Sequence, residues 1–290
     1  MKFLIIGGSG FLGSHVADYL LSEGHEVFIY DKVKSKYLSK NQNFILGDLN
    51  NENLLNLSMK NIDYVFNFAA IAGLKESKNN PLETIRHNIH GALLPMIIAD
   101  RNKVKKYFFA SSIYVYSDKG SFYRCSKQAA ENYIVEYAKN SKIKYTILRY
   151  GSLYGLRSGD ENGLYKIIKL AVQNKKITYD GNPNSIRAYI HVLDAAKASS
   201  VFLEKKFDNK IINLLGKESI KIIDLMLMIK EMLKIKTKIN FKRIKDSSNY
   251  TITPYSYQDN IGENYQSNLS IDFGQGILQL IHELKSIKKK

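Results

Sequence analysis

The chain has 290 residues, of which 44% are hydrophobic, which is enough for one large domain or two small ones with their own core. Its formal net charge of +16 suits an anionic ligand, but because the lysines are scattered and tryptophan is absent, we interpret the charge as a solvated surface and expect no nucleic-acid partner. The single cysteine, Cys125, excludes an internal disulfide, and no apolar run is long enough to span a membrane. The sequence therefore predicts a soluble, cytoplasmic protein.

The first 31 residues predict a strand, a glycine-rich turn, a helix and a second strand. The apolar run 2–6 is too short for a helix and leads into a turn containing Gly7, Gly10 and Gly13. Apolar residues then recur at helical spacing as far as Gly24. In such a unit the first glycine permits a tight turn, the second lets the backbone approach a pyrophosphate, and the third lets the helix pack against the strand. The helix N-terminus then offers N–H groups and the positive end of its dipole to that anion.

The second strand ends in an acidic residue. Asp31 follows Gly13 by 18 residues, where a carboxylate can accept hydrogen bonds from the adenosine ribose hydroxyls. Because it would repel a 2′-phosphate, we expect NAD rather than NADP, although the adjacent Lys32 weakens that preference.

Strands and helices then alternate as far as Tyr150. The predicted strands are 44–47, 64–68, 106–110 and 145–149, and the predicted helices are 51–59, 81–102 and 123–140. This alternation indicates an α/β fold of the Rossmann type, a doubly wound parallel sheet with helices on both faces. Ligands bind beyond the carboxyl ends of such strands, and these residues all lie there: Gly7, Asp31, Asp48, Ala69, Ser112.

Beyond Tyr150 the alternation is less regular. We predict helices at 163–174, 192–204 and 219–233, and short strands at 177–179 and 188–191; the segment 245–270 receives no assignment. The predicted division is a dinucleotide-binding domain over 1–160, to which 186–215 returns, and a smaller mixed α/β substrate lobe over 161–290.

A tyrosine and a lysine are the candidate catalytic pair. Tyr123 and Lys127 are four residues apart, hence neighbours on one helix face. An ammonium beside a phenol stabilises the phenolate, so we expect the pKa of Tyr123 to move from about 10 toward neutrality, which suits a general acid/base. Ser112, at a strand end, could hydrogen-bond a substrate oxygen. We expect no metal.

These motifs together resemble the extended short-chain dehydrogenase/reductases, and more narrowly the NAD-dependent epimerase/dehydratase family that acts on nucleotide sugars. The resemblance rests on the glycine turn 7–13, Asp48-Leu49, the segment 111–116, the pair Tyr123 and Lys127, and the segment 186–192 with Asp194.

The resemblance implies roles for residues throughout the site. Ser112, Tyr123 and Lys127 would be catalytic. The cofactor NAD would contact Gly7, Gly10, Phe11, Leu12, Gly13, Asp31, Lys32, Asp48, Leu49, Phe68, Ala69, Ala70, Asn88, Tyr123 and Lys127. A nucleotide-diphosphate sugar would contact Ser112, Tyr150, Ser152 and Arg187, the last through its diphosphate. The helices 81–102 and 123–140 correspond to the family's dimer interface, so we expect a homodimer.

Departures from the family pattern narrow the chemistry. Nucleotide-sugar 4,6-dehydratases carry an Asp-Glu pair directly after the serine, where this chain has Ile113 and Tyr114, so we do not expect that activity. Tyr123 follows Ser112 by only 11 residues, which implies a reduced cover over the sugar. Ser152 stands where many relatives have asparagine, and Ala188 replaces an acidic residue.

We therefore expect a nucleotide-sugar epimerase that acts by transient oxidation of a hydroxyl at C4. The alternative is a net oxidoreductase, either a 4-ketosugar reductase or a sugar 4-dehydrogenase, since the same residues serve both. A third and less favoured hypothesis is a non-catalytic NAD-binding or RNA-associated protein on the same scaffold.

Overall fold

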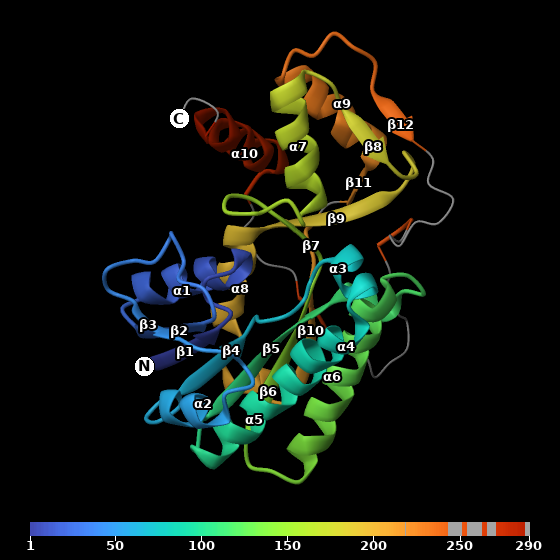
Figure 1. The fold of residues 1–290 in the computed structure, drawn as a ribbon. Coiled ribbons are helices and arrows are strands. Elements are labelled where there is room, and N and C mark those ends of the chain that lie inside the picture. The colour runs from blue at the N-terminus through green and yellow to red at the C-terminus, as the bar shows by residue number, and fades with distance from the viewer. Residues whose placement is uncertain (218, 243–250, 254–262, 266–270, 288–290) are drawn as a thin grey trace.

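A parallel sheet of eight strands forms the larger part of the molecule (Figure 1). The computed structural model describes residues 1–217, 219–242, 251–253, 263–265 and 271–287. Within them the strand order is β13-β10-β6-β5-β4-β1-β2-β3. The bounds are β1 (Lys2–Ile6), β2 (Glu26–Asp31), β3 (Asn43–Leu46), β4 (Tyr64–Asn67), β5 (Lys106–Ser112), β6 (Lys144–Tyr150), β10 (Lys210–Leu214) and β13 (Glu263–Tyr265).

Helices cover both faces of this sheet, which explains why its central strands are apolar almost throughout. Phe3 and Ile5 of β1 face one layer, with α1 (Phe11–Ser22) and α8 (Val192–Val201). Leu4 and Ile6 face the other layer, with α2 (Glu52–Ser58), α5 (Gly91–Arg101) and α6 (Ser121–Lys139). Because alternate side chains point to opposite faces, a single strand contributes to both cores. The predicted α/β fold with a large parallel sheet is confirmed.

The segment predicted as one helix over 81–102 is interrupted. It contains α4 (Pro81–Thr84), a π-helical turn (Ile85–His90) and α5, and it is preceded by α3 (Leu74–Asn79). Pro95 lies inside α5 and has no N–H to donate to the carbonyl of Gly91. The Asn67 side-chain amide donates to that carbonyl instead, at 2.8 Å. The carbonyl of Gly91 is therefore still hydrogen-bonded, through a side chain of the neighbouring strand β4.

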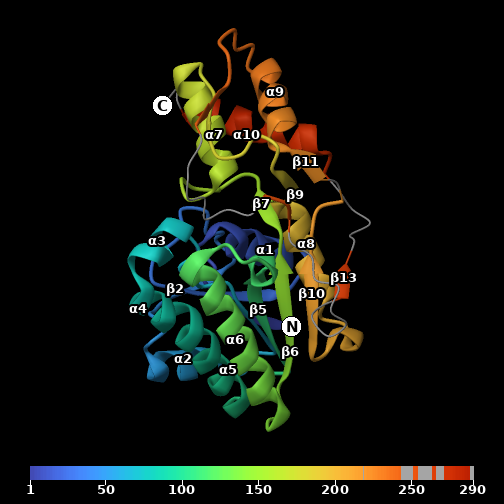
Figure 2. The ribbon, with the colours of Figure 1, turned by 90° about the vertical axis from the view of Figure 1, so that its right-hand side faces the viewer.

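A smaller part lies beyond the carboxyl ends of the large sheet (Figures 1 and 2). Its strands form the order β11-β9-β7 and a separate pair, β12-β8. Its helices α7, α9 and α10 share one apolar core that includes Leu164, Leu225 and Ile277. The bounds are β7 (Ser152–Tyr154), α7 (Gly163–Asn174), β8 (Thr178–Asp180), β9 (Ile186–His191), β11 (Ser219–Lys221), α9 (Ile222–Met232), β12 (Asn240–Lys242) and α10 (Phe273–Ile287). The helix predicted at 219–233 begins later, because residues 219–221 form β11 and the helix α9 starts at Ile222. The sequence analysis did not predict α10.

Two short 3-10 turns, Ile113–Tyr116 and Lys205–Phe207, complete the described elements. Most of the unassigned segment 245–270 lies outside the described residues; of it, 251–253 and 263–265 are described. In the ranges that the structure describes, no helix has the length and apolar character that a membrane crossing needs.

Candidate active site

The turn after β1 leaves no room for side chains at two of its glycines. Gly7 has a φ of +75°, and a Cβ there would lie 2.6 Å from the backbone nitrogen of Ala69. A Cβ on Gly13 would lie 2.3 Å from the carbonyl oxygen of Gly7. Since backbone atoms cannot give way as flexible side chains do, both positions require glycine. The result is a bare backbone surface at the N-terminus of α1, which is the arrangement expected for a pyrophosphate.

Two backbone N–H groups hold the carboxylate of Asp31, one in the glycine turn and one two residues further along the chain. Its Oδ2 accepts a hydrogen bond from the Ser9 N–H at 3.0 Å, and its Oδ1 accepts one from the Val33 N–H at 3.1 Å. These bonds fix the carboxylate beside the glycine turn. The adjacent Lys32 is exposed.

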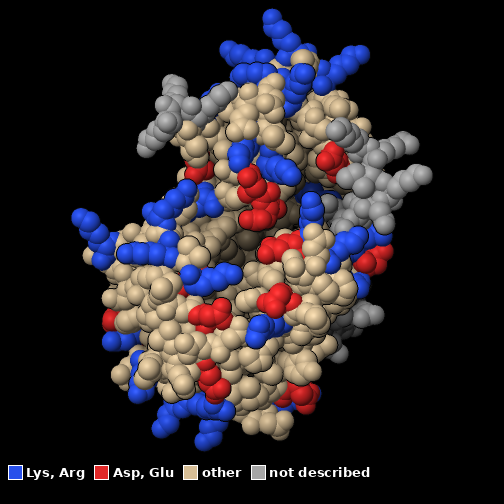
Figure 3. Space-filling view, viewed as in Figure 1, with Lys and Arg blue, Asp and Glu red and all other residues tan. Residues whose placement is uncertain are grey.

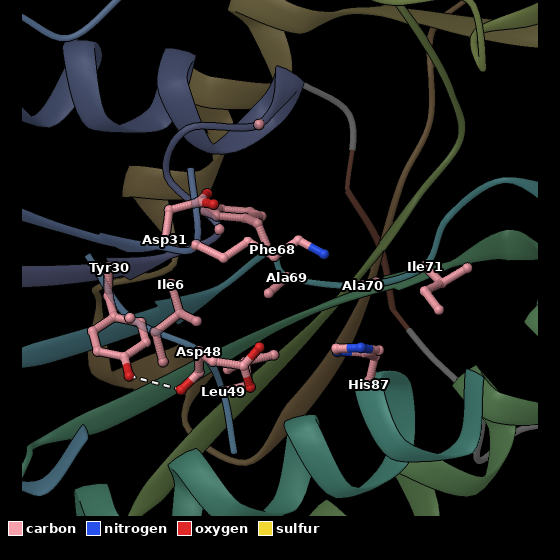
Figure 4. A pocket seen from close by; sticks show the side chains of 14 residues that line it. Ile6, Tyr30, Asp31, Asp48, Leu49, Phe68, Ala69, Ala70, Ile71 and His87 are labelled. Carbon is pink, nitrogen blue, oxygen red and sulfur yellow. Dashed lines mark hydrogen bonds between the residues drawn. The ribbon is translucent and has the colours of Figure 1, made fainter. Parts of the chain in front are cut away.

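A cavity of about 190 Å³ opens between the glycine turn and the ends of β2, β3 and β4 (Figure 4). Nine of the predicted cofactor residues line it: Gly7, Gly10, Asp31, Lys32, Asp48, Leu49, Phe68, Ala69 and Ala70. The sequence analysis missed Ile6, Tyr30, Gly47, Ile71 and His87, which line it as well. The position of Tyr30 beside Asp31 in the sequence was a usable signal. In the structure its hydroxyl donates to the carbonyl of Asp48 at 2.8 Å.

Six predicted cofactor residues do not line this cavity: Phe11, Leu12, Gly13, Asn88, Tyr123 and Lys127. Asn88 is buried in the π-helical turn and links two other segments. Its side chain accepts from the Ile71 N–H at 2.7 Å and donates to the carbonyl of Ile71 and to the Ser126 hydroxyl. It therefore fixes the cavity wall at Ile71 against α6, the helix that carries Tyr123 and Lys127.

The three predicted catalytic residues come together at the carboxyl end of β5. The Ser112 hydroxyl lies near enough to the phenol of Tyr123 to act on its pKa, and it accepts from the Tyr114 N–H at 3.3 Å. Lys127 lies one turn along α6, 2% exposed, and its ammonium donates to the carbonyl of Ala110 at 2.7 Å. Its Nζ is 5.9 Å from the centroid of the Tyr123 ring.

The protonation states differ from the sequence prediction. Burial raises the pKa of Tyr123 to about 12, against the opposing effect of the Ser112 hydrogen bond. Burial also lowers the pKa of Lys127 to about 7, while the Glu131 carboxylate acts to raise it. The prediction that the pKa of Tyr123 falls toward neutrality is therefore wrong for this arrangement. The cause is desolvation, which disfavours the charged form of both groups.

The predicted substrate residues lie in different surroundings. Tyr150 is 4% exposed, and its hydroxyl is 2.7 Å from that of Ser199 on α8, so its phenol points into the core between β6 and α8. Ser152 begins β7 and is half-buried. Arg187 on β9 is 7% exposed, and its guanidinium donates to the carbonyls of Ile186 and Thr251 at 3.0 and 3.4 Å.

Comparison with known proteins gives a match over most of the chain. The model of the "NAD dependent epimerase/dehydratase family" matches residues 3–214. The chain belongs to this family. A UDP-N-acetyl-alpha-D-glucosaminuronate decarboxylase from Bacillus cytotoxicus is 31% identical over 243 residues, which cover 73% of this chain and 74% of the relative. A provisionally named UDP-glucose 4-epimerase from Methanocaldococcus jannaschii is 26% identical and matches 98% of both chains. The solved UDP-glucose 4-epimerase of Thermotoga maritima, with UDP-glucose, has the same fold, with a TM-score of 0.87 at 24% identity over 100% of both chains.

This family membership confirms the resemblance seen in the sequence motifs. Among the described residues of this family member, the positions after Ser112 carry no carboxylate: Ile113 is 1% exposed, and the Tyr114 ring lies edge-on to Tyr123 with centroids 6.2 Å apart. The chain is thus a member of a nucleotide-sugar epimerase/dehydratase family in which an aromatic side chain, and not an acid, adjoins the phenol.

A buried ion pair beside the predicted catalytic residues was missed by the sequence analysis. Glu131 on α6 and Arg149 on β6 have side chains only 6% and 4% exposed and bind one another. The helical spacing of Glu131 from Tyr123 and Lys127 was a usable signal, because residues 123, 127 and 131 lie on one face. The partner on β6 could not be inferred from spacing.

Proposed function

We propose that this protein is an NAD-dependent nucleotide-sugar epimerase, acting by transient oxidation of a sugar hydroxyl at C4. The observation that carries this proposal is that Ser112 and Tyr123 come together at the carboxyl end of β5, where the Ser112 hydroxyl acts on the pKa of the phenol, with Lys127 one turn further along α6. Both hydroxyls lie at the edge of the sheet where the glycine turn and the cavity also lie. In this proposal they serve as a proton donor and acceptor for a sugar oxygen.

The residues present fit NAD. Gly7 and Gly13 leave the bare backbone that a pyrophosphate needs, and Asp31 is oriented to accept hydrogen bonds from ribose hydroxyls. The cavity between them is bounded by the small side chains Ala69 and Ala70. When bound, NAD would supply the acceptor and donor for a hydride.

The proposed chemistry of the chain itself is proton transfer and positioning. Tyr123, after losing its own proton to form the phenolate, takes the proton from the sugar hydroxyl and later returns it, while Ser112 hydrogen-bonds the same oxygen. Lys127 would hold a ribose hydroxyl of the dinucleotide and would supply positive charge near the phenol. Figure 3 shows a hollow between the two parts of the molecule, with side chains of both signs around it, which is a suitable place for the sugar to turn over.

Epimerisation is favoured over 4,6-dehydration by the two residues after Ser112. Elimination of water needs an acid and a base beside the ring, and Ile113 and Tyr114 supply no carboxylate. The relatives' names include a UDP-sugar decarboxylase and UDP-sugar 4-epimerases, so we propose a UDP-linked sugar as the substrate. Ser152 and Arg187 remain the proposed contacts to it, since a guanidinium is a strong phosphate ligand.

We also propose a division of labour along the chain. Residues 1–160 would bind the dinucleotide and 161–290 mainly the substrate. Of the segment 186–215, β10 belongs to the large sheet, and α8 shares a core with α1 and β1, whereas β9 pairs in the smaller sheet. This crossing would let one continuous stretch contact both ligands.

The test is conversion of defined sugars by the purified protein. UDP-glucose, UDP-galactose, UDP-N-acetylglucosamine and UDP-glucuronate are each incubated with the protein and NAD, and products are followed by NMR and mass spectrometry. The proposal predicts C4 epimers of unchanged mass without net NADH formation. Stoichiometric NADH production or NAD(P)H consumption would indicate the oxidoreductase alternative, and loss of carbon dioxide would indicate a decarboxylase. Absence of both NAD binding and conversion would overturn the proposal.

A further inference from the structure

Glu131 and Arg149 form a buried, fully bonded ion pair between α6 and β6. Arg149 Nε donates to one carboxylate oxygen of Glu131 at 2.9 Å, and a terminal guanidinium nitrogen donates to the other. The Ser111 hydroxyl donates to the same carboxylate, and the Tyr116 hydroxyl lies against the guanidinium. Glu131 therefore has donors on both oxygens although it is closed off from water.

This pair is attached directly to the catalytic cluster. Ser111, which binds Glu131, precedes Ser112, and Ala110, whose carbonyl accepts from Lys127, precedes Ser111. On α6, Lys127 and Glu131 are one turn apart. The helix is thus tied to the end of β5 by two bonds from successive turns, and Arg149 extends the connection to β6.

Stability gives a poor reason for placing two charges here. Desolvation of a buried ion pair commonly cancels its attraction, and well-packed apolar side chains often serve equally well. The pair does provide a fixed negative charge one turn from Lys127. Within the described ranges, Glu131 is the carboxylate whose charge acts on the pKa of that ammonium.

We propose that Glu131 is a positioning residue for Tyr123 and Lys127: its carboxylate, held by Arg149 and Ser111, keeps α6 against the ends of β5 and β6 and places a negative charge one turn from the Lys127 ammonium. This inference deepens the proposed function and rests on it for its catalytic meaning. The geometry itself does not depend on which sugar is the substrate.

The charged and titratable groups around Lys127 come from several elements. From α6 they are Tyr123 and Glu131, from β6 Arg149, and from the turn after β5 Tyr116. The face of β5 contributes the Phe109 ring, 4.5 Å from Nζ, and a backbone carbonyl. Glu131 is the group whose charge raises the pKa of Lys127 against the effect of burial. Removing that charge should therefore favour the neutral amine.

The direct test is a titration of Lys127 by NMR of the Cε–Hε signals in lysine-labelled protein. A signal titrating near pH 7 and missing in Lys127→Met is assigned to Lys127. In Glu131→Gln, which keeps the shape but not the charge, we expect this titration to move to lower pH by about one unit. The matched control is Asp208→Asn, which neutralises the partner of buried Lys106 at the other end of β5 and should leave the Lys127 titration unchanged.

The double variant Glu131→Gln/Arg149→Met leaves neither member of the ion pair buried without its partner and serves if the single variant does not fold. It too should titrate at lower pH than the wild type. With turnover as a second readout, the basic limb of the pH–rate profile should move the same way. An unchanged titration in both variants would overturn the inference, with or without a uniform loss of rate.

Failure of the proposed function would look different. In that case the Lys127 titration would still move in Glu131→Gln, while the wild-type protein neither bound NAD nor converted any of the UDP-sugars. That outcome would support the electrostatic role of Glu131 and refute the epimerase.

Discussion

Burial raises the pKa of Tyr123 to about 12, so the phenol holds its proton at neutral pH. The proposed oxidation needs this group as a base, and the phenol must therefore first lose its proton. Accepting a proton requires positive charge nearby, and on α6 Lys127 is the cation whose Nζ lies 5.9 Å from the ring. The charge state of Lys127 is therefore as important to the proposed epimerase as the phenol itself.

Replacing Tyr123 by phenylalanine should remove the proton carrier and little else. We expect kcat to fall by about 10²–10⁴-fold, since that is the usual contribution of a positioned acid/base. The ring keeps its edge-on contact with Tyr114, so NAD binding should persist. Tyr133→Phe, an exposed tyrosine on the same helix, is the matched control. Turnover is measured by NMR of the sugar product. A wild-type rate in Tyr123→Phe would refute the acid/base role of Tyr123.

The positions of these side chains were predictable, whereas their charge states were not. Helical spacing put Tyr123 and Lys127 on one face, and strand ends put Ser112 beside them. The pKa values depend on burial and on two partners that spacing cannot identify, the carbonyl of Ala110 and the carboxylate of Glu131. Tyr150 shows the same limit, because only the packed structure brings its hydroxyl to Ser199.

At the scale of elements, the turn between β1 and α1 depends on close backbone contact. Substituting alanine at Gly13 places a methyl group 2.3 Å from the Gly7 carbonyl, so the turn must shift. We expect at least about a tenfold loss of NAD affinity and a stability loss of about 1–3 kcal/mol, as for other overpacked sites. Calorimetric titration with NAD and urea unfolding would measure both.

Gly24 is the appropriate control for that substitution. It has a φ of +80° at the end of α1, yet nothing lies within 4 Å of a Cβ there. Gly24→Ala should cost about 1–2 kcal/mol through backbone strain alone and leave NAD affinity as it is. An equal loss of affinity in both variants would mean that the close approach at Gly13 has no special role.

The start of α8 makes stability depend on pH. His191 caps this helix by accepting the Leu193 N–H at 3.3 Å, and burial, then the nearby His15, lowers its pKa to about 4. A folded-state pKa below the unfolded value of about 6.5 means that the unfolded chain binds the proton more readily. The stability from neutral His191 is therefore complete above about pH 6.5 and is lost as the pH falls toward 4.

Urea unfolding between pH 7 and 4 tests this dependence. We expect His191 to account for at most about 3 kcal/mol of the decline in unfolding free energy, and His191→Gln should flatten it. His282 on α10 is exposed, so His282→Gln should keep the wild-type slope. A slope unchanged in His191→Gln would show that other groups cause the acid sensitivity.

The element order was predictable from the sequence, but the break in the helix over 81–102 was not. Pro95 is a local signal, because it cannot donate to the carbonyl of Gly91, but the bonds at the break are tertiary: Asn88 bonds to Ile71, 17 residues away, and Asn67 bonds to the carbonyl of Gly91. The same Asn88 reaches Ser126 on α6, so the irregular turn connects the proposed cofactor cavity to the helix that carries Tyr123 and Lys127. Periodicity detects the helix and cannot detect the partner that distorts it.

At the scale of the whole molecule, apolar side chains remain exposed on the helices that cover one face of the large sheet. Leu82 and Ile85 of α4 and the π-helical turn are 78% and 51% exposed, and Phe122 and Tyr133 of α6 are 46% and 54% exposed. Because these residues lie on two helical segments that contact one another, we interpret them as the surface that the proposed homodimer would bury.

A charge placed in that surface should separate the subunits. We expect the wild-type protein to sediment at twice its chain mass of 33.2 kDa, and Tyr133→Glu to sediment as a monomer at micromolar concentration, because an unpaired carboxylate in an apolar interface is costly. Leu227→Glu, at an exposed apolar position on α9, is the matched control and should remain dimeric. A wild-type chain that sediments as a monomer would remove the interface, and it would leave the catalytic cluster untouched, since Ser112, Tyr123 and Lys127 all belong to one chain.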